Sequence, residues 1–191
     1  VHLAGRFWHT LDPDNAFDTV SFIAVGNVYE SLITFKSVKD LDNFEPFLAA
    51  QVPTVENGLL STDRRVYVFP LRQDVRFHDG SLMTPEDVRY SLLRFMLLNP
   101  ETGPAELLLR PVLGASGAAT DFKRVMDAVN VSSDAVTVTL AKPDETFLKT
   151  LAALPLVMPK AWAVVHGEWD GTEASWRRLK SRPLNESYLH A

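Results

Sequence analysis

His78 and Asp79 are the adjacent side chains of this sequence best suited to chemistry, because an imidazole beside a carboxylate can hold a metal or move a proton. A hydrolase built on such a pair needs further histidine and acidic ligands at helical spacing. The other histidines stand at positions 2, 9, 166 and 190 and form no H-x-x-x-H pair. Asp79-Gly80 is a tight-turn dipeptide, so a structural role is the favoured interpretation. A metallohydrolase that uses His78 and Asp79 is the alternative.

Other catalytic and metal-binding patterns are weaker still. Residues 168–173 (Glu-Trp-Asp-Gly-Thr-Glu) offer three acids around a glycine, but they lack the regular ligand spacing of a calcium loop. They predict a turn that leads into a capped helix. The sequence has no cysteine, no P-loop, no G-x-G-x-x-G and no G-x-S-x-G nucleophile elbow. We therefore predict no enzyme activity, no cofactor and no bound metal.

Composition points to an ordinary globular chain with enough apolar material for a core. Of 191 residues, 46% are hydrophobic, and the formal net charge is −5. This negative balance argues against a general nucleic-acid surface, which needs clustered Lys and Arg. The one dense basic run, at positions 177, 178, 180 and 182, is interpreted as a solvated helix end. No window reaches the roughly 18 consecutive apolar residues of a membrane span.

The His-Asp-Gly turn precedes a strongly signalled helix. Thr84-Pro85-Glu86-Asp87 combines an N-cap threonine, a proline at the first helical position and two acids in the first turn. The buried stripe is predicted at Val88, Leu92, Phe95 and Met96. Arg89 and Arg94 are predicted to lie off this stripe.

Further elements follow from turn and capping signals, and together they predict an α+β fold with hairpins. Strands are expected at 32–35, 66–69, 129–131 and 136–140, with Val136, Val138 and Leu140 facing inward. Pro70 places the second strand at a sheet edge or ends it there. Helices are expected after Asp18, Asp144 and Pro159; residues 20–28 place Val20, Ile23, Ala24, Asn27 and Val28 on one helix face. Residues 44–50 are predicted to be an irregular or short helical turn, and 103–119 a long excursion. Trp162, Trp169 and Trp176 are assigned to core packing in separate elements.

Four stretches, taken in order, resemble family 5 extracellular solute-binding proteins, the oligopeptide- and dipeptide-binding type of ABC importer component. They are "LDPDNAFDTVSFIAVGNVYESLITF" (11–35), "FEPFLAAQVPT" (44–54), "YVFPLRQDVRFHDGSLMTPEDVRYSLLRF" (67–95) and "VNVSSDAVTVTLAKPDETFLKTLAA" (129–153). The third is the most specific. It joins a strand, an aromatic-His-Asp-Gly turn and a Thr-x-Glu-Asp-Val helix start.

The resemblance implies a type II periplasmic-binding-protein fold of cluster C, in which two lobes close over a solute. Members of that family are much longer than 191 residues, so we expect a fragment that lacks the second lobe. Residues 1–35 would be the first strand and helix of lobe one on the cleft side. Residues 36–176 would be an additional small domain with adjoining lobe-one elements, and 177–191 a truncated end.

By the same resemblance, the expected function is capture of peptides or similar solutes outside the cytoplasmic membrane and delivery to ABC permease subunits. Relatives bind peptides, opines, sugars and metal chelates, so the solute stays open. Trp8, His9, Thr10 and Asn27 are the predicted solute-contacting residues. We expect a monomer with no nucleic-acid partner. We expect it to be periplasmic or extracellular, with the export signal outside this chain. Whether the full-length protein carries a lipid anchor stays open. A regulator's sensor domain is a further alternative, but it would need a DNA-binding segment that this sequence lacks.

Overall fold

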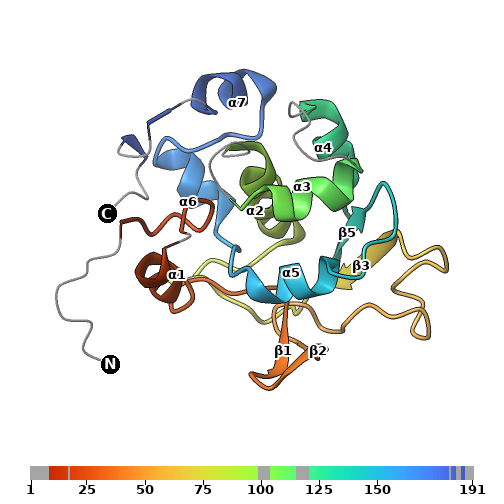
Figure 1. Cartoon of the computed structure of the whole chain (residues 1–191). Coiled ribbons are helices and arrows are strands. Elements are labelled where there is room, and N and C mark those ends of the chain that lie inside the picture. Colours follow the sequence, from red (N-terminus) through yellow and green to blue (C-terminus); the bar gives the residue numbers. More distant parts are fainter. Residues whose placement is uncertain are drawn as a thin grey trace.

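The computed structural model describes residues 9–16, 18–98, 104–114, 121–180, 182–183 and 186–187. Helices and short antiparallel strands alternate along this part of the chain, as Figure 1 shows. In chain order they are α1 (Thr19–Val25), β1 (Ile33–Ser37), β2 (Asp40–Pro46), β3 (Val66–Pro70), α2 (Pro85–Leu98), α3 (Glu106–Leu113), α4 (Phe122–Ala128), β4 (Val129–Val131), β5 (Ala135–Thr139), α5 (Phe147–Ala153), α6 (Lys160–Val165) and α7 (Glu173–Leu179). The predicted α+β class is confirmed.

Helix α2 lies in the middle of the molecule and is the element around which the others pack (Figure 1). It contacts α3, α4, α6, α7 and the sheet strands β4 and β5. Every residue from Tyr90 to Leu98 is buried, which requires side chains that tolerate burial on all faces of the helix. The prediction that Arg94 lies off the buried stripe is therefore wrong, since this residue is 1% exposed.

The larger sheet has three antiparallel strands in the order β3-β5-β4, with Tyr67 opposite Val138. Val136, Val138 and Leu140 are buried, so the predicted inward face of β5 is confirmed. Strand β3 forms an edge of this sheet. Pro70 ends that strand, as a proline without a ladder donor must.

Strands β1 and β2 form a separate hairpin that projects from the lower side of the molecule in Figure 1. The prediction of an irregular or helical turn at residues 44–50 is wrong for 44–46, which belong to strand β2, whereas residues 47–50 are irregular and include an isolated bridge at Ala49. Phe44 pairs across the hairpin with Phe35, with ring centroids 5.8 Å apart. Such a cross-strand aromatic pair stabilises the extended conformation.

Helix α1 begins where the sequence predicts, but it buries a different face. The Asp18 carboxylate accepts hydrogen bonds from the backbone N–H groups of Val20 and Ser21, which confirms the N-cap. The helix ends at Val25, and its buried residues are Ser21 and Val25. Ile23 is 47% exposed, so the predicted apolar face is not the packed one.

Two of the remaining helices differ from what the sequence signals predict. Within the predicted excursion, residues 106–113 form α3, which ends at Gly114 with a φ of 79°. Helix α5 starts at Phe147 rather than at the residue after Asp144, whose carboxylate instead closes the preceding turn on Thr146. Trp169 and Trp176 are buried in the core and Trp162 is half-buried on α6. Among the described helices, none combines the length and apolar character that crossing a membrane requires.

Candidate binding groove

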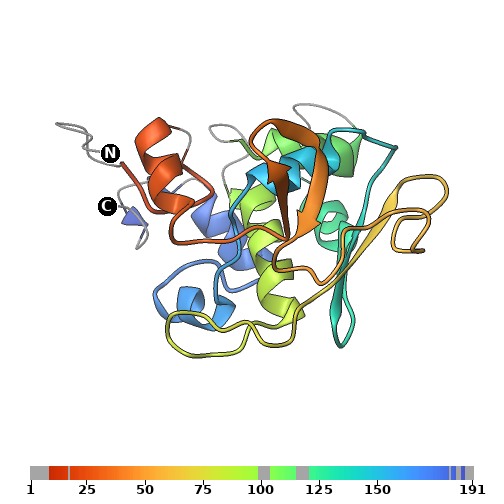
Figure 2. The ribbon, with the colours of Figure 1, turned by 90° about the horizontal axis from the view of Figure 1, so that it is seen from below.

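A groove of about 660 Å³ opens where four segments of the chain meet. These segments are residues 26–30 after α1, 47–48 after β2, 75–79 before α2 and 157–159 before α6. Met83 and Trp162 complete the lining. Figure 2 shows the segment between β3 and α2 running past α6, which brings two parts of the sequence some 80 residues apart to one site. Only the tertiary fold assembles this groove.

Backbone hydrogen bonds fix the walls of the groove. The N–H of Val157 donates to the carbonyl of Glu30 at 3.2 Å, which joins two of the segments as an isolated antiparallel bridge. The Phe77 N–H donates to the Ser81 carbonyl at 2.9 Å, and the Gly80 N–H donates back to Phe77 at 2.9 Å. Gly80 has a φ of 87°, in the left-handed region that glycine adopts at little cost. The predicted turn role of Asp79-Gly80 is confirmed.

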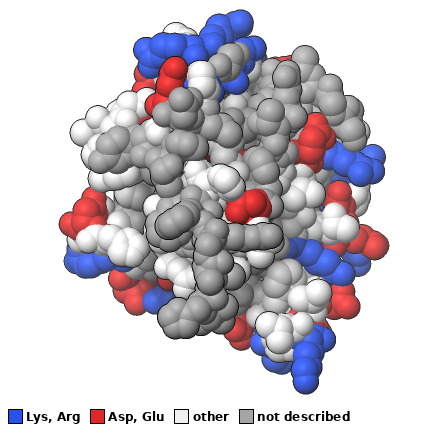
Figure 3. Space-filling model, turned by 60° about the vertical axis from the view of Figure 1, so that its left-hand side comes forward, with Lys and Arg blue, Asp and Glu red and all other residues white. Residues whose placement is uncertain are grey.

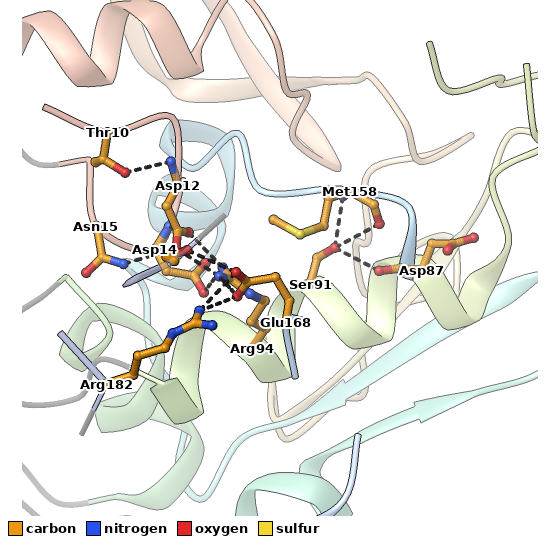
Figure 4. Close-up of polar contacts among 11 residues, drawn as sticks. Thr10, Asp12, Asp14, Asn15, Asp87, Ser91, Arg94, Met158, Glu168 and Arg182 are labelled. Atoms are coloured by element: carbon orange, nitrogen blue, oxygen red, sulfur yellow. Dashed lines mark hydrogen bonds and ion pairs between the residues drawn. The ribbon is translucent and has the colours of Figure 1, made fainter. Parts of the chain in front are cut away.

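The first turns of α2 hold residues 158 and 160, beside the groove, through two polar side chains, Asp87 and Ser91. The Asp87 carboxylate accepts from the Thr84 N–H (2.8 Å) and the Thr84 hydroxyl (2.7 Å), and also from the Lys160 N–H (2.8 Å). Ser91 Oγ accepts from the Met158 N–H at 3.0 Å and donates to the Asp87 carbonyl at 2.8 Å (Figure 4). One carboxylate thus caps α2 and anchors the start of α6, which supplies Trp162.

The lining is mostly apolar with a few polar groups at its rim. The apolar residues are Val28, Tyr29, Phe47, Leu48, Val75, Phe77, Met83, Val157, Met158, Pro159 and Trp162. The polar ones are Asn27, Glu30, Arg76, His78 and Asp79, all exposed. The hydrogen bond from the Ser81 hydroxyl lowers the pKa of Asp79 and keeps it ionised. An apolar hollow with a small number of polar groups has the usual make-up of a ligand site.

The predicted solute-contacting residues do not gather at this groove. Asn27 lines it, with its Nδ2 donating to the Ile23 carbonyl at 2.7 Å. His9 and Thr10 instead direct their backbone N–H groups to Ser21 Oγ on α1, at 2.8 and 3.3 Å. His9 is exposed and Thr10 is 5% exposed. Trp8 lies outside the described residues, and solute contact by all four stays a prediction.

His78 and Asp79 have a location that the sequence did not indicate. Both line the groove, although the sequence favours a purely structural role for this turn. No local signal announces this location, because the opposite wall comes from residues 157–162. Across the described part of the chain, no group of three or more His, Cys, Asp or Glu residues could hold a metal ion.

A second concentration of charge is buried at the other end of α2, and we call it the Arg94 cluster: Asp12, Asp14, Arg94, Glu168 and Arg182. Arg94 contacts Asp12 through both terminal nitrogens at 2.7 and 2.8 Å, Glu168 at 2.9 Å, and also Asp14. Arg182 holds both Glu168 oxygens, at 2.9 and 2.8 Å (Figure 4). The cluster joins the N-terminal segment, α2 and the loop before α7.

The carboxyl groups of the cluster differ in electrostatics. Burial opposes ionisation of Asp12 and Glu168, but the charge and hydrogen bonds of Arg94 together with the other donors around each carboxylate outweigh it and lower the pKa of both. At Asp14, burial raises the pKa by more than the Arg94 guanidinium lowers it. The nearby carboxylates of Asp12 and Glu168 raise this pKa further, so it lies well above the ordinary value. Isolated acids and one arginine inside an apolar helix are the signs of this cluster that the sequence contains.

The surface basic residues behave as predicted. Lys and Arg side chains gather at the top of Figure 3, over α7, which carries Arg177 and Arg178 and is followed by Lys180, all exposed. Arg177 pairs with Glu173 one turn earlier, and Lys180 lies 4.8 Å from the centroid of the Trp176 ring. Arg182 is the exception, since its guanidinium turns inward to the cluster. The solvated helix end is confirmed for the rest of the run.

The fold is that of the type II periplasmic binding proteins. The structure superposes on the peptide-bound oligopeptide-binding protein OppA of Listeria monocytogenes with a TM-score of 0.63 at 19% identity, covering 83% of this chain and 30% of that one. The sequence model of the family "Bacterial extracellular solute-binding proteins, family 5 Middle" matches residues 43–183. The chain belongs to this family of extracellular solute-binding proteins.

Two relatives carry dipeptide-binding names. The dipeptide-binding protein DppE of Bacillus subtilis (strain 168) is 27% identical over 146 residues, 75% of this chain and 25% of DppE. A dipeptide-binding protein of Lactococcus lactis subsp. cremoris (strain MG1363) is 28% identical over 173 residues, 86% of this chain and 29% of that protein. The chain therefore spans between a quarter and a third of the length of these relatives.

Proposed function

We propose that this chain is part of a solute-capturing subunit of an ABC importer, and that the groove forms part of the surface that receives the solute. Membership of the family and the names of the two dipeptide-binding relatives support the first part. The second part is carried by one observation. The 660 Å³ groove is apolar, open and rimmed by Asn27, Glu30, Arg76, His78 and Asp79.

Such a groove is suited to a solute that has both apolar and polar parts. Trp162, Phe47 and Phe77 offer apolar contact area, and the rim offers hydrogen-bond donors and acceptors of both charges. A solute held in this way is bound and released without covalent chemistry. Delivery to permease subunits, a location outside the cytoplasmic membrane and a monomeric state complete the proposal.

Titration of the isotope-labelled chain with a mixture of short peptides, followed by NMR, tests the assignment of the groove. We expect chemical-shift changes at residues 26–30, 75–79 and 157–162, with weak affinity because one surface alone immobilises a solute incompletely. Shifts confined to other parts of the chain would remove the groove from the proposal.

A pair of aromatic substitutions supplies the matched control. Trp162→Ala truncates a groove side chain, whereas Phe22→Ala truncates a 44% exposed aromatic on α1 that does not line the groove. The first should weaken peptide binding several-fold, and the second should leave it unchanged. Equal losses in both variants would mean that apolar surface in general, and not the groove, attracts the peptides.

A further inference from the structure

The Arg94 cluster has more negative than positive groups. Its carboxyls, on Asp12, Asp14 and Glu168, face the guanidiniums of Arg94 and Arg182. The side chains of all but Arg182 are exposed by 3% or less, and Arg182 by 17%. Fully ionised, three acids and two bases leave one negative charge in the interior, where an uncompensated charge is very costly. One bound proton would neutralise the cluster.

Hydrogen-bond donors are distributed unevenly among the three carboxyls. Asp12 accepts from Arg94 through both oxygens, and also from the Asp14 N–H (3.1 Å) and Asn15 Nδ2 (3.2 Å). Glu168 accepts from Arg94, from Arg182 and from the Ser187 hydroxyl at 3.0 Å. Two of the three carboxylates are therefore well supplied with donors that stabilise the charged form.

Asp14 is the exception. Among the described residues, its carboxyl accepts only from Arg94 Nη1, the same nitrogen that also serves Asp12. The other ionisable groups described around it add no positive charge that is not already paired. Tyr29, which follows α1, and Tyr90, on α2, are kept neutral because burial raises the pKa of both hydroxyls, and Arg182 is engaged with Glu168.

We propose that the Arg94 cluster is a proton-binding site in which Asp14 carries the proton in the folded protein, and that this proton secures residues 10–15 against α2. The raised pKa of Asp14, caused first by burial, agrees with the geometry. The segment also holds the amides of His9 and Thr10 on Ser21, so the site controls how firmly the N-terminal segment is seated. The inference does not depend on which solute the protein binds.

The sign of the pH dependence follows from the directions of the shifts. Because the folded state raises the pKa of Asp14, its contribution to stability is complete below the ordinary pKa of an aspartic acid, about 4, and is lost as pH rises through the folded pKa. Asp12 and Glu168 have lowered pKa values, so their contribution is lost as pH falls. Stability should therefore decline on both sides of an optimum, and among the three carboxyls of the cluster it is Asp14 that contributes to the decline as pH rises.

Carboxyl carbon-13 NMR on the unmodified chain tests the site directly. We expect the Asp14 signal to titrate well above pH 4, and those of Asp12 and Glu168 below the ordinary carboxyl range. Titration of Asp14 at or below about pH 4 would overturn the proposal.

Thermal unfolding as a function of pH, with an isosteric variant, tests the consequence for stability. Between about pH 4 and the folded pKa of Asp14, the melting temperature of the parent chain should fall by roughly 3 to 5 °C per pH unit. Asp14→Asn mimics the protonated carboxyl and should remove this slope. Asp127→Asn, an exposed acid paired with Lys123, should keep it. An unchanged slope in Asp14→Asn contradicts the proposal, and if that variant fails to fold, the carbon-13 titration still decides.

Hydrogen exchange tests whether the proton seats the N-terminal segment. As pH rises through the folded pKa of Asp14, the amides of His9 and Thr10 should lose protection beyond the ordinary base-catalysed increase. The amide of Lys160, held by Asp87, should show only the ordinary increase. Equal changes at all three amides would mean that the proton on Asp14 does not hold residues 10–15 in place, and would refute that part of the proposal.

Discussion

The two ends of α2 handle polar groups in opposite ways. At the start of the helix, Asp87 and Ser91 meet backbone N–H groups, and the charged side chains nearby stay at the rim of an open groove. Toward its end, Arg94 enters a sealed site and meets carboxylates. Exposed rim charges keep their hydration and contribute little to stability. Buried charges have lost theirs, so the removal of one partner leaves the others at high cost.

This contrast distinguishes a region whose polar groups can take new partners from one whose polar groups cannot. The groove presents polar groups that are exposed to water and can exchange it for a solute, which is what a binding surface requires. The cluster presents groups whose hydrogen bonds are committed within the protein, which is what an anchor requires. Both are built on one helix, so substitutions along α2 can disturb either without touching the other.

Arg94→Met should produce the largest effect, because it leaves three carboxyls buried without their central guanidinium. We expect a loss of about 3 to 5 kcal/mol in the free energy of unfolding, measured by urea denaturation. The control is Arg177→Met, which removes an exposed pair with Glu173 and should leave the midpoint unchanged. If both variants lose the same free energy of unfolding, the buried Arg94 cluster contributes no more to stability than an exposed ion pair does.

Asp87→Ala should have the second largest effect. It removes the acceptor of the Thr84 and Lys160 N–H groups, and we expect a loss of about 2 kcal/mol. Exchange of the Lys160 amide should become faster, because the start of α6 is no longer tied to α2. Glu86→Ala, an exposed acid in the same turn, should change stability by less than about 0.5 kcal/mol. Unchanged exchange of the Lys160 amide would show that Asp87 does not hold the start of α6.

Gly80→Ala should cost less, about 1 kcal/mol, through backbone strain alone. Gly80 has a positive φ of 87°, and a Cβ there meets no atom within 4 Å. Gly26 also lines the groove but has a φ of −64°, so Gly26→Ala should be neutral or stabilising by about 0.5 kcal/mol. Thermal unfolding of the two variants compares them, and a stable Gly80→Ala protein would mean that the turn can adopt another conformation.

His78→Ala should have the smallest effect on stability, within about 0.5 kcal/mol, because the side chain is exposed at the groove rim. Denaturation measures this change. Elemental analysis of the purified parent and variant provides a second reading, and no metal should depend on His78. A stoichiometric metal that disappears in the variant would revive the metallohydrolase interpretation.

The sequence alone indicated most of the local structure, because helix caps, turns and strand alternation depend on residues close together in the chain. Asp18, the Thr84-Pro85 helix start and the inward face of β5 are of this kind. The strand at 40–46 was missed because its stability comes from Phe35 on the partner strand rather than from its own pattern. The family resemblance, carried by ordered local motifs, was also recognisable from the sequence.

Only the tertiary structure decided where the polar groups meet. The partners of Arg94 lie 82, 80 and 74 residues away along the chain, and Lys160 lies 73 residues from Asp87. The periodicity of a sequence gives no information about contacts between residues so far apart. Arg94 was therefore predicted to lie off the buried stripe, although it is the centre of a buried cluster. The same packing turned His78 and Asp79 from a simple turn into part of a groove. Local sequence fixes the conformation of a segment, whereas long-range packing determines which side chains keep their water and which must find partners.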